Sequence, residues 1–332
     1  MQIREEVAPD MTLTIEHVTK SYGSFRAVDD VSFTVTPGRI FGFLGTNGAG
    51  KTTTMRMILD IFRPDAGTIS WNGVATRDIP RSDFGYLPEE RGLYPKMAVD
   101  DQLLFLAQLY GASKRDASAA LDEWLERLDV VENKKKRIEQ LSKGNQQKIQ
   151  FLAAILHDPD ILILDEPFSG LDPVNAEQMK RAFLTMRDRG KTIIFSTHQL
   201  DDAQELCHDV AIIHRGKLMI AGDVRSVRQS TGHQVVRFGV SGNPGLPWLS
   251  DLPGVTIGRQ REDAVELSVP DEESARAVLH EAVRRGLPVN QFEISYPSLN
   301  EVFLSLVRDI PGEAEAPDAQ NAKQLVMAGG RS

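Results

Sequence analysis

A glycine-rich stretch constrains the fold of this chain more than any other feature of its sequence. It fits the phosphate-binding pattern G-x-x-x-x-G-K-[ST] at every required position and consists of Gly45, Thr46, Asn47, Gly48, Ala49, Gly50, Lys51, Thr52 and Thr53. Its three glycines let successive backbone N–H groups turn toward an anion without a Cβ in the way. Lys51 is predicted to reach the β- and γ-phosphates of a nucleotide, and Thr52 to bind Mg²⁺.

The sequence on either side of this loop agrees with a nucleotide-binding α/β fold. Residues 39–44 read as a buried strand, and residues 53–62 read as a helix that starts near Lys51. The positive end of such a helix would face the same anion as the loop. A chance glycine-rich turn is the alternative, but a strand before and a helix after make that alternative weaker.

Composition limits the class of protein and its compartment. The chain has 332 residues, which is enough for two or three domains, and its net charge of −9 argues against nucleic-acid binding. Its one cysteine, Cys207, allows no internal disulfide. The first residues do not resemble a secretory signal, and no apolar run approaches the ~20 residues that span a bilayer. The chain is therefore expected to be soluble, or to reach a membrane only through a partner.

Changes in pattern along the chain predict its domains. Residues 1–10 are expected to be a loose lead-in to a nucleotide-binding domain at residues 11–230. Residues 231–310 combine strand patterns with a helix at 271–285, so a small α+β accessory domain is predicted there. Residues 311–332 are rich in Ala, Glu, Asp, Gln and Pro and are predicted to be disordered.

Within the larger domain, three kinds of segment are expected. Alternating segments at 12–18, 31–35 and 68–71 predict antiparallel strands, the last of which enters a tight turn at Asn72-Gly73. Residues 98–133 carry apolar stripes that are typical of helices. Continuous apolar runs at 161–164 and 192–196 predict strands that are buried on both faces.

Polar residues follow those two buried strands and mark a second part of the site. Asp165 and Glu166 end the first strand, and His198 closely follows the second. Parallel sheets bind ligands at the carboxyl ends of their strands, so these side chains are expected near the phosphate loop. His198 could instead be a satisfied core histidine, but a carboxylate pair and a phosphate loop favour a functional role.

These motifs, in this order, make residues 11 to about 230 resemble the ATP-binding subunit of ABC transporters. Tyr22 matches the aromatic residue that stacks on adenine in that family, although alone it would read better as a half-buried turn tyrosine. Residues 141–147 stand at the family's signature, residues 161–166 at its Walker-B strand and residues 169–172 at its D-loop. His198 matches the switch histidine.

The resemblance implies a P-loop NTPase fold with a RecA-like core, an antiparallel β subdomain and a helical subdomain. It also implies a head-to-tail dimer, homo- or heteromeric, with ATP between the subunits and a multi-span membrane permease as partner. The chain would then lie peripherally on the cytoplasmic face of the membrane.

The same resemblance assigns roles to individual residues. Asp165 would hold Mg²⁺ through water, Glu166 would polarise the attacking water and His198 would contact the γ-phosphate. The remaining nucleotide contacts implied by the signature and the D-loop are Ser142, Lys143, Gly144, Asn145 and Asp172.

Three positions depart from the family pattern. Lys143 replaces a glycine and Asn145 a glutamine of the signature. Glu89 stands where the Q-loop usually has glutamine, and its carboxylate could still bind Mg²⁺ while adding negative charge.

The transported substrate is open at this point. Residues 86–94, the run at 141–148 and the small C-terminal domain resemble the sodium-export type of ATP-binding subunit. Drug, lipid or antibiotic efflux is the alternative. A soluble ABC protein of DNA repair or translation is disfavoured by the single P-loop and the acidic charge, and a regulator without turnover is disfavoured by Glu166 and His198.

Overall fold

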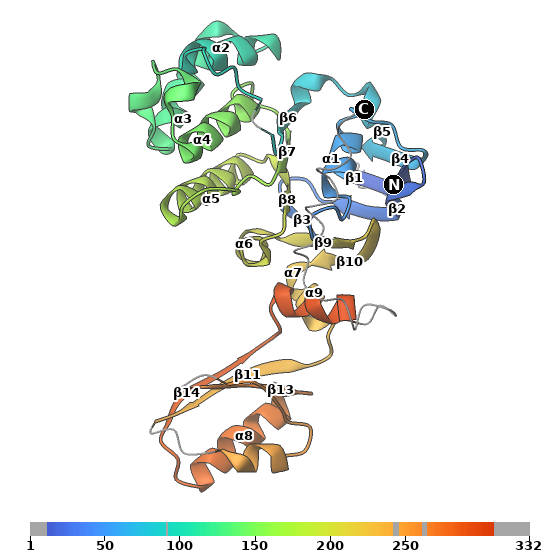
Figure 1. Cartoon of the computed structure of the whole chain (residues 1–332), viewed down its shortest axis with the longest axis vertical. Helices are drawn as coiled ribbons and strands as arrows, with labels where there is room; N and C mark the ends of the chain where they lie inside the picture. The colour runs from blue at the N-terminus through green and yellow to red at the C-terminus, as the bar shows by residue number, and fades with distance from the viewer. Residues whose placement is uncertain (1–11, 91, 242–245, 261–263, 309–332) are drawn as a thin grey trace, which may run out of the picture. The chain divides into compact units, whose positions relative to one another are not determined.

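The computed structural model describes residues 12–90, 92–241, 246–260 and 264–308 of the chain (Figure 1). The lead-in predicted at residues 1–10 and the disordered tail predicted at residues 311–332 lie outside the described residues. The chain separates into two compact units between Gly232 and His233, and each unit is described by itself.

The N-terminal unit is built around a mostly parallel sheet. Its strands are β3 (Ile40–Leu44), β6 (Phe84–Leu87), β7 (Ile161–Asp165), β8 (Thr192–Thr197), β9 (Asp209–His214) and β10 (Lys217–Asp223), in the spatial order β10-β9-β3-β8-β7-β6. Only the β9–β10 pair is antiparallel within this sheet. Every residue of β3, β7 and β8 is buried, which explains why these strands read as continuous apolar runs.

A second, antiparallel sheet belongs to the same unit. Its strands are β1 (Leu13–Tyr22), β2 (Phe25–Val35), β4 (Ala66–Trp71) and β5 (Val74–Ala75), in the spatial order β2-β1-β4-β5. Asn72 and Gly73 join β4 to β5 with φ angles of 53° and 77°, so the tight turn expected from Asn-Gly is confirmed.

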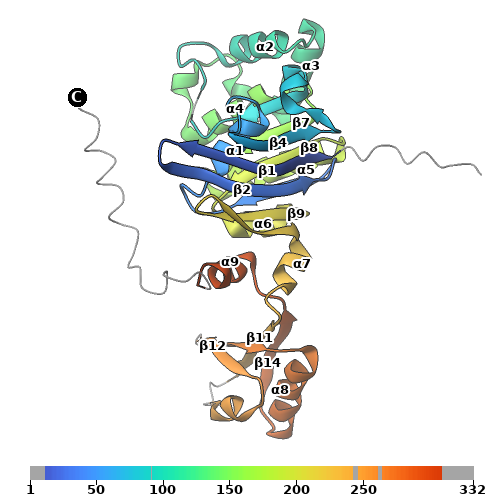
Figure 2. The ribbon, with the colours of Figure 1, turned by 90° about the vertical axis from the view of Figure 1, so that its right-hand side faces the viewer.

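One hydrophobic core joins the two sheets through helix α1 (Lys51–Ile58), and both views show α1 among their strands (Figures 1 and 2). Phe33 of the antiparallel sheet stacks on Phe41 and Phe43 of β3, with ring centroids 5.2 and 5.3 Å apart. This packing fixes the strand that enters the phosphate loop and the helix that leaves it.

The other helices of the N-terminal unit are α2 (Val99–Leu109), α3 (Lys114–Arg127), α4 (Lys143–Ile155), α5 (Pro173–Asp188), α6 (Leu200–Leu206) and α7 (Val224–Gln229). Short 3-10 turns lie at Thr76–Asp78, Arg81–Asp83, Val131–Asn133 and Ile138–Gln140. Rings of Phe151, Phe168, Phe183 and Phe195 pack α4 and α5 against β8 at centroid distances of 5.1 to 5.8 Å.

Two predicted helices end or break earlier than the apolar pattern indicates. The helix expected at residues 53–62 stops at Ile58, because Asp60 has a left-handed φ of 49° and Pro64 follows. The helical region expected at 98–133 divides at Gly111, whose φ is 95°. No helix among the described residues combines the length and the apolar character that a membrane crossing requires.

The C-terminal unit has an antiparallel sheet with a helix on one face. Its strands are β11 (Gln234–Val240), β12 (Thr256–Gln260), β13 (Val265–Val269) and β14 (Val289–Ser295), in the spatial order β12-β13-β11-β14. Helix α8 (Glu272–Arg284) packs on this sheet (Figure 2), a 3-10 turn spans Pro247–Asp251, and α9 (Leu299–Arg308) is the last described helix. The sequence from Ser298 to Glu301 fits a capping box, and this box opens α9: Glu301 N donates to Ser298 Oγ at 3.2 Å and Ser298 N donates to Glu301 Oε2 at 2.7 Å.

Candidate functional site

The phosphate loop connects β3 to α1, as the sequence predicts. Gly50 caps the helix with φ 108°, and a Cβ at this position would lie 2.5 Å from the carbonyl oxygen of Ala27, so only glycine fits. The Lys51 ammonium donates to the carbonyl oxygens of Gly45 and Thr46 at 2.8 and 3.2 Å. A fixed cation and the free N–H groups of a helix start are therefore held at one place.

A cavity of about 390 Å³ opens beside this loop. Its lining residues are Tyr22, Phe25, Ala27, Asn47, Gly48, Gly50, Lys51, Thr52, Thr53, Glu89, Asp165 and Glu166. Segments that are far apart in the sequence thus meet around one space. Most of the residues predicted for nucleotide and metal binding are brought together here.

The acidic pair at the end of β7 lies deep in this cavity. Asp165 is 1% exposed and Glu166 is 7% exposed. Glu166 Oε1 lies 3.5 Å from Lys51 Nζ and 3.0 Å from His198 Nδ1, so the carboxylate stands between a lysine and a histidine. The backbone of Glu166 has a left-handed φ of 48°, which costs a non-glycine residue on the order of 1 kcal/mol. The structure therefore places His198 beside the predicted catalytic acid rather than in a separate core.

The residues present fit a divalent cation. Asp165 Oδ1 accepts a hydrogen bond from Ser196, whereas Asp165 Oδ2 is buried and has no hydrogen-bond partner in the part of the chain that the structure describes. A buried carboxylate oxygen without a partner is costly unless something pairs with it. Thr52 and Glu89 supply further oxygen atoms to the same cavity, and oxygen ligands are those that Mg²⁺ prefers.

Hydrogen bonds from helix α4 fix the backbone of the loop that carries Glu89. Gln150 of α4 donates from its side-chain amide to the carbonyl oxygens of Pro88 and Glu90, at 2.9 and 3.0 Å. The backbone is thereby tied on both sides of Glu89, whose side chain lines the cavity. Burial raises the pKa of the neighbouring Tyr86 hydroxyl, and the charge of Asp165 adds to that increase.

The signature residues lie at the start of α4 and do not line this cavity. Ser142 caps the helix by accepting a hydrogen bond from Asn145 N at 3.2 Å, and Lys143 is exposed. A Cβ at Gly144 would lie 3.1 Å from Asn175 Nδ2, so the start of α4 borders the start of α5.

The D-loop residue Asp172 lies at that same border. Asp172 caps α5 by accepting a hydrogen bond from Asn175 N at 2.9 Å, and this bond lowers the pKa of Asp172. Together with Ser142 and Gly144 it forms a second group of predicted site residues, apart from the cavity lining.

Four contributors to the site carry no motif in the sequence, namely Ala27, Phe25, Ser196 and Gln150. Phe25 lines the cavity and is 62% exposed; an exposed aromatic residue just after the Tyr22 turn is the signal that could have found it. Ser196 is fully buried and bonds to Asp165, and a hydroxyl at the end of an apolar strand is its only signal. Gln150 is a polar residue on the buried side of a helix.

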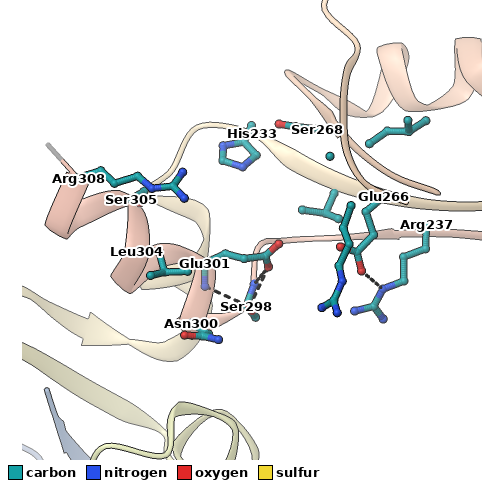
Figure 3. A pocket seen from close by; sticks show the side chains of 14 residues that line it. His233, Arg237, Glu266, Ser268, Ser298, Asn300, Glu301, Leu304, Ser305 and Arg308 are labelled. Atoms are coloured by element: carbon teal, nitrogen blue, oxygen red, sulfur yellow. Dashed lines mark hydrogen bonds and ion pairs between the residues drawn. The ribbon is translucent and has the colours of Figure 1, made fainter. Parts of the chain in front are cut away.

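A larger cavity of about 720 Å³ lies within the C-terminal unit, between its sheet and α9 (Figure 3). One arginine of this cavity is paired with carboxylates, and one glutamate is bonded to a serine. Arg237 lies 3.4 Å from Glu266 and 3.6 Å from Glu293, and Glu301 is bonded to Ser298 in the capping box. None of the residues predicted for nucleotide or metal binding lines this cavity.

Comparison with known proteins identifies relatives for both units. Residues 28–169 match the family described as ABC transporter, and residues 222–307 match the C-terminal domain of DrrA1-3-like ATP-binding proteins. The chain is 42% identical over 295 residues to the uncharacterized ABC transporter ATP-binding protein YhaQ of Bacillus subtilis, a match that covers 89% of this chain and 98% of that protein.

Two further similarities extend the comparison. The linearmycin resistance ATP-binding protein LnrL of Bacillus subtilis is 29% identical, over 89% of this chain and 97% of its own length. A solved structure of an ATP-binding subunit of an ABC transporter is 31% identical and superimposes with a TM-score of 0.62, covering 66% of this chain and 93% of that chain.

Proposed function

The chain belongs to the ABC transporter family as an ATP-binding ATPase subunit, and we propose that it drives export of a substrate through a separate membrane-spanning permease. The observation that carries the proposal is the cavity in which the phosphate loop meets Tyr22, Glu89 and the acidic pair. A pocket with this lining supplies donors for phosphates, oxygen ligands for Mg²⁺ and a carboxylate that can orient water.

The proposed roles follow from chemistry and position. Lys51 and the loop N–H groups bind the β- and γ-phosphates, while Tyr22 stacks on adenine. Thr52 and Asp165 hold Mg²⁺, whose charge offsets that of the phosphates, and Glu89 faces the same ion. Glu166 accepts a hydrogen bond from the attacking water, and His198 contacts the γ-phosphate while orienting Glu166.

A dimer is part of the proposal, because a second group of residues lies outside the cavity lining. Ser142, Gly144 and Asp172 cluster where α4 and α5 begin. In a head-to-tail dimer, homo- or heteromeric, this cluster and its neighbours Lys143 and Asn145 would close the cavity of the second subunit. Residues 11–230 would form this ATP-binding domain, residues 231–310 would be an accessory domain, and the permease would hold the assembly at the cytoplasmic face of the membrane.

Two substrate classes follow from different observations. The resemblance of residues 86–94 and 141–148 to the sodium-export type of ATP-binding subunit supports sodium as the exported ion. The near full-length similarity to a linearmycin resistance protein supports efflux of an antibiotic, another drug or a lipid as the alternative. Uptake into inverted membrane vesicles that contain the chain and its permease distinguishes the two substrate classes. ATP should drive uptake of either sodium or the antibiotic, but not of both.

The catalytic assignment is tested with Glu166→Gln. This variant should bind ATP as the wild type does, and its hydrolysis rate should fall by a factor of at least about 100. It should therefore accumulate as an ATP-bound dimer. ATP turnover and size-exclusion chromatography with ATP measure the two effects. Glu177→Gln, on the exposed surface of α5, is the control and should behave as wild type. Wild-type turnover in Glu166→Gln would place the catalytic acid elsewhere.

A further inference from the structure

One hydroxyl contacts both members of the acidic pair. Ser196 is the fifth residue of β8 (Thr192–Thr197), and the strand register places it directly opposite Asp165 of β7. Its side chain is fully buried. We propose that Ser196 is a positioning residue for ATP hydrolysis, which sets the Asp165 oxygen offered to Mg²⁺ and fixes the backbone that carries Glu166. The inference rests on the roles proposed above for Asp165 and Glu166.

The contact with Asp165 selects between the two carboxylate oxygens. The Ser196 hydroxyl donates to Oδ1 of Asp165, and Oδ2 is left buried with no partner among the described residues. A carboxylate whose one oxygen is already bonded cannot rotate freely, so Oδ2 keeps a fixed direction. A serine hydroxyl can donate only one hydrogen bond. Because it donates that bond to Oδ1, Oδ2 is the oxygen that remains for the cation.

The contact with Glu166 acts on the main chain. Glu166 N donates both to Ser196 Oγ at 3.1 Å and to the Ser196 carbonyl oxygen at 3.2 Å. These bonds hold the first residue beyond β7 in the left-handed conformation with φ 48°. A strained conformation persists only where its surroundings determine it, and here the serine is a large part of those surroundings.

One side chain thus couples the metal-binding carboxylate to the catalytic one. Partners that orient metal ligands typically change metal affinity or activity by about 10- to 100-fold when they are removed. A hydroxyl that only filled space in the core would have no such effect, because alanine in its place would leave both carboxylates where they are.

The test compares Ser196→Ala with Ser196→Thr and Thr192→Val. Thr192 is a buried residue of the same strand, and its hydroxyl accepts a hydrogen bond from Gly38 N at 3.0 Å, far from the acidic pair. Thr192→Val therefore measures the loss of a buried hydroxyl without a carboxylate contact. The full chain is studied by thermal unfolding with the non-hydrolysable analogue AMP-PNP, in EDTA and in a Mg²⁺ titration, and by ATP turnover.

We expect Ser196→Ala to bind AMP-PNP in EDTA as the wild type does, but to need about 10-fold more Mg²⁺ for the metal-dependent increase in melting temperature. Its kcat should fall by about 10- to 100-fold at saturating Mg²⁺, with KM for ATP unchanged. Ser196→Thr keeps the hydroxyl and should restore both values, while Thr192→Val should alter neither.

Four results would each overturn the proposal. Wild-type Mg²⁺ dependence and kcat in Ser196→Ala, with Glu166→Gln inactive, would remove the role of Ser196 and leave the ATPase assignment intact. Loss of AMP-PNP binding in EDTA, or equal defects in Thr192→Val, would reduce Ser196 to a structural residue. Wild-type turnover in Glu166→Gln would overturn both the catalytic assignment and the inference that rests on it.

Discussion

At the scale of single residues, the site depends on buried charges that satisfy one another. The side chains of Lys51 and Glu166 are 7% and 8% exposed and lie 3.5 Å apart. Charges this deeply buried are tolerated only when they are paired and hydrogen-bonded, and the loop carbonyls and His198 complete the pairing. Replacing either Lys51 or Glu166 should therefore leave the other charge buried without its partner, in addition to removing a group that takes part in binding or hydrolysis.

Lys51→Ala tests the phosphate-binding role. Removing the cation deletes charged hydrogen bonds worth about 1.5–3 kcal/mol each, so ATP affinity should fall by about 10- to 100-fold. A titration with ATP in EDTA measures this without the contribution of the metal. Lys217→Ala is the matched control, because the Lys217 side chain is 69% exposed and its ammonium lies 3.7 Å from Asp29. Equal affinity in Lys51→Ala and wild type would contradict the assignment of the phosphate loop.

At the scale of elements, α4 connects several parts of the site. Its Gln147 donates to the carbonyl oxygen of Pro167, just after the acidic pair, at 3.0 Å. Its Lys148, whose pKa is lowered by burial, donates to the Leu128 carbonyl oxygen at 2.9 Å. Gln150 holds the loop of Glu89, as described above. A shift of α4 would thus move the signature residues and change the hydrogen bonds that hold the chain beside Glu166 and beside Glu89.

His157, in the turn that follows α4, should make the stability of the protein depend on pH. His157 bonds through Nε2 to the Phe84 carbonyl oxygen at 3.0 Å and stacks on Tyr110 at 4.6 Å between ring centroids. Burial lowers the pKa of His157 below its ordinary value of about 6.5. Between these two pKa values the unfolded chain binds more protons than the folded chain, so stability falls as the pH drops through about 6.5 and levels off below the folded pKa.

Replacing His157 should weaken the dependence of melting temperature on pH. His157→Phe keeps a ring to stack on Tyr110 but cannot take up a proton. Melting temperature measured between pH 5 and pH 8 should therefore fall less on acidification in the variant than in the wild type. Parallel curves for the two proteins would show that other groups cause the acid sensitivity.

The local elements and much of the candidate site could be predicted from the sequence, because their signals are local. The glycine spacing of the phosphate loop, the apolar run before Asp165 and the capping box at Ser298 each predict a feature that the structure contains. Non-local contacts could not be predicted in this way. The bond from Ser196 to Asp165 spans 31 residues, and that from Gln150 to Pro88 spans 62, so both depend on strand register and packing.

At the scale of the whole molecule, the hydrophobic core around α1 and the hydrophobic core around α8 are built from separate stretches of sequence. The core around α1 uses residues from Leu13 to Ile213, and the core around α8 uses residues from Val236 onward. The lining of the nucleotide cavity comes entirely from the N-terminal unit. Removing the C-terminal unit would therefore take away no lining residue of this cavity.

A chain that ends at Gly232 should keep the ATP site. Its affinity for ATP should match that of the full chain, because no lining residue of the cavity is removed. Circular dichroism establishes that the truncated protein is folded, and an ATP titration then measures binding. A folded, soluble truncated protein that fails to bind ATP would contradict this separation of roles.

The left-handed backbone of Glu166 has a consequence for protein engineering. Asparagine and glycine adopt φ 48° more readily than glutamate does, so either substitution would relieve strain of on the order of 1 kcal/mol. Neither residue offers a carboxylate to water. Nor does either residue offer one to Lys51, and leaving that buried charge without its partner costs about 3–5 kcal/mol, more than the relieved strain. A directed-evolution screen that rewards heat resistance should therefore retain glutamate at this position.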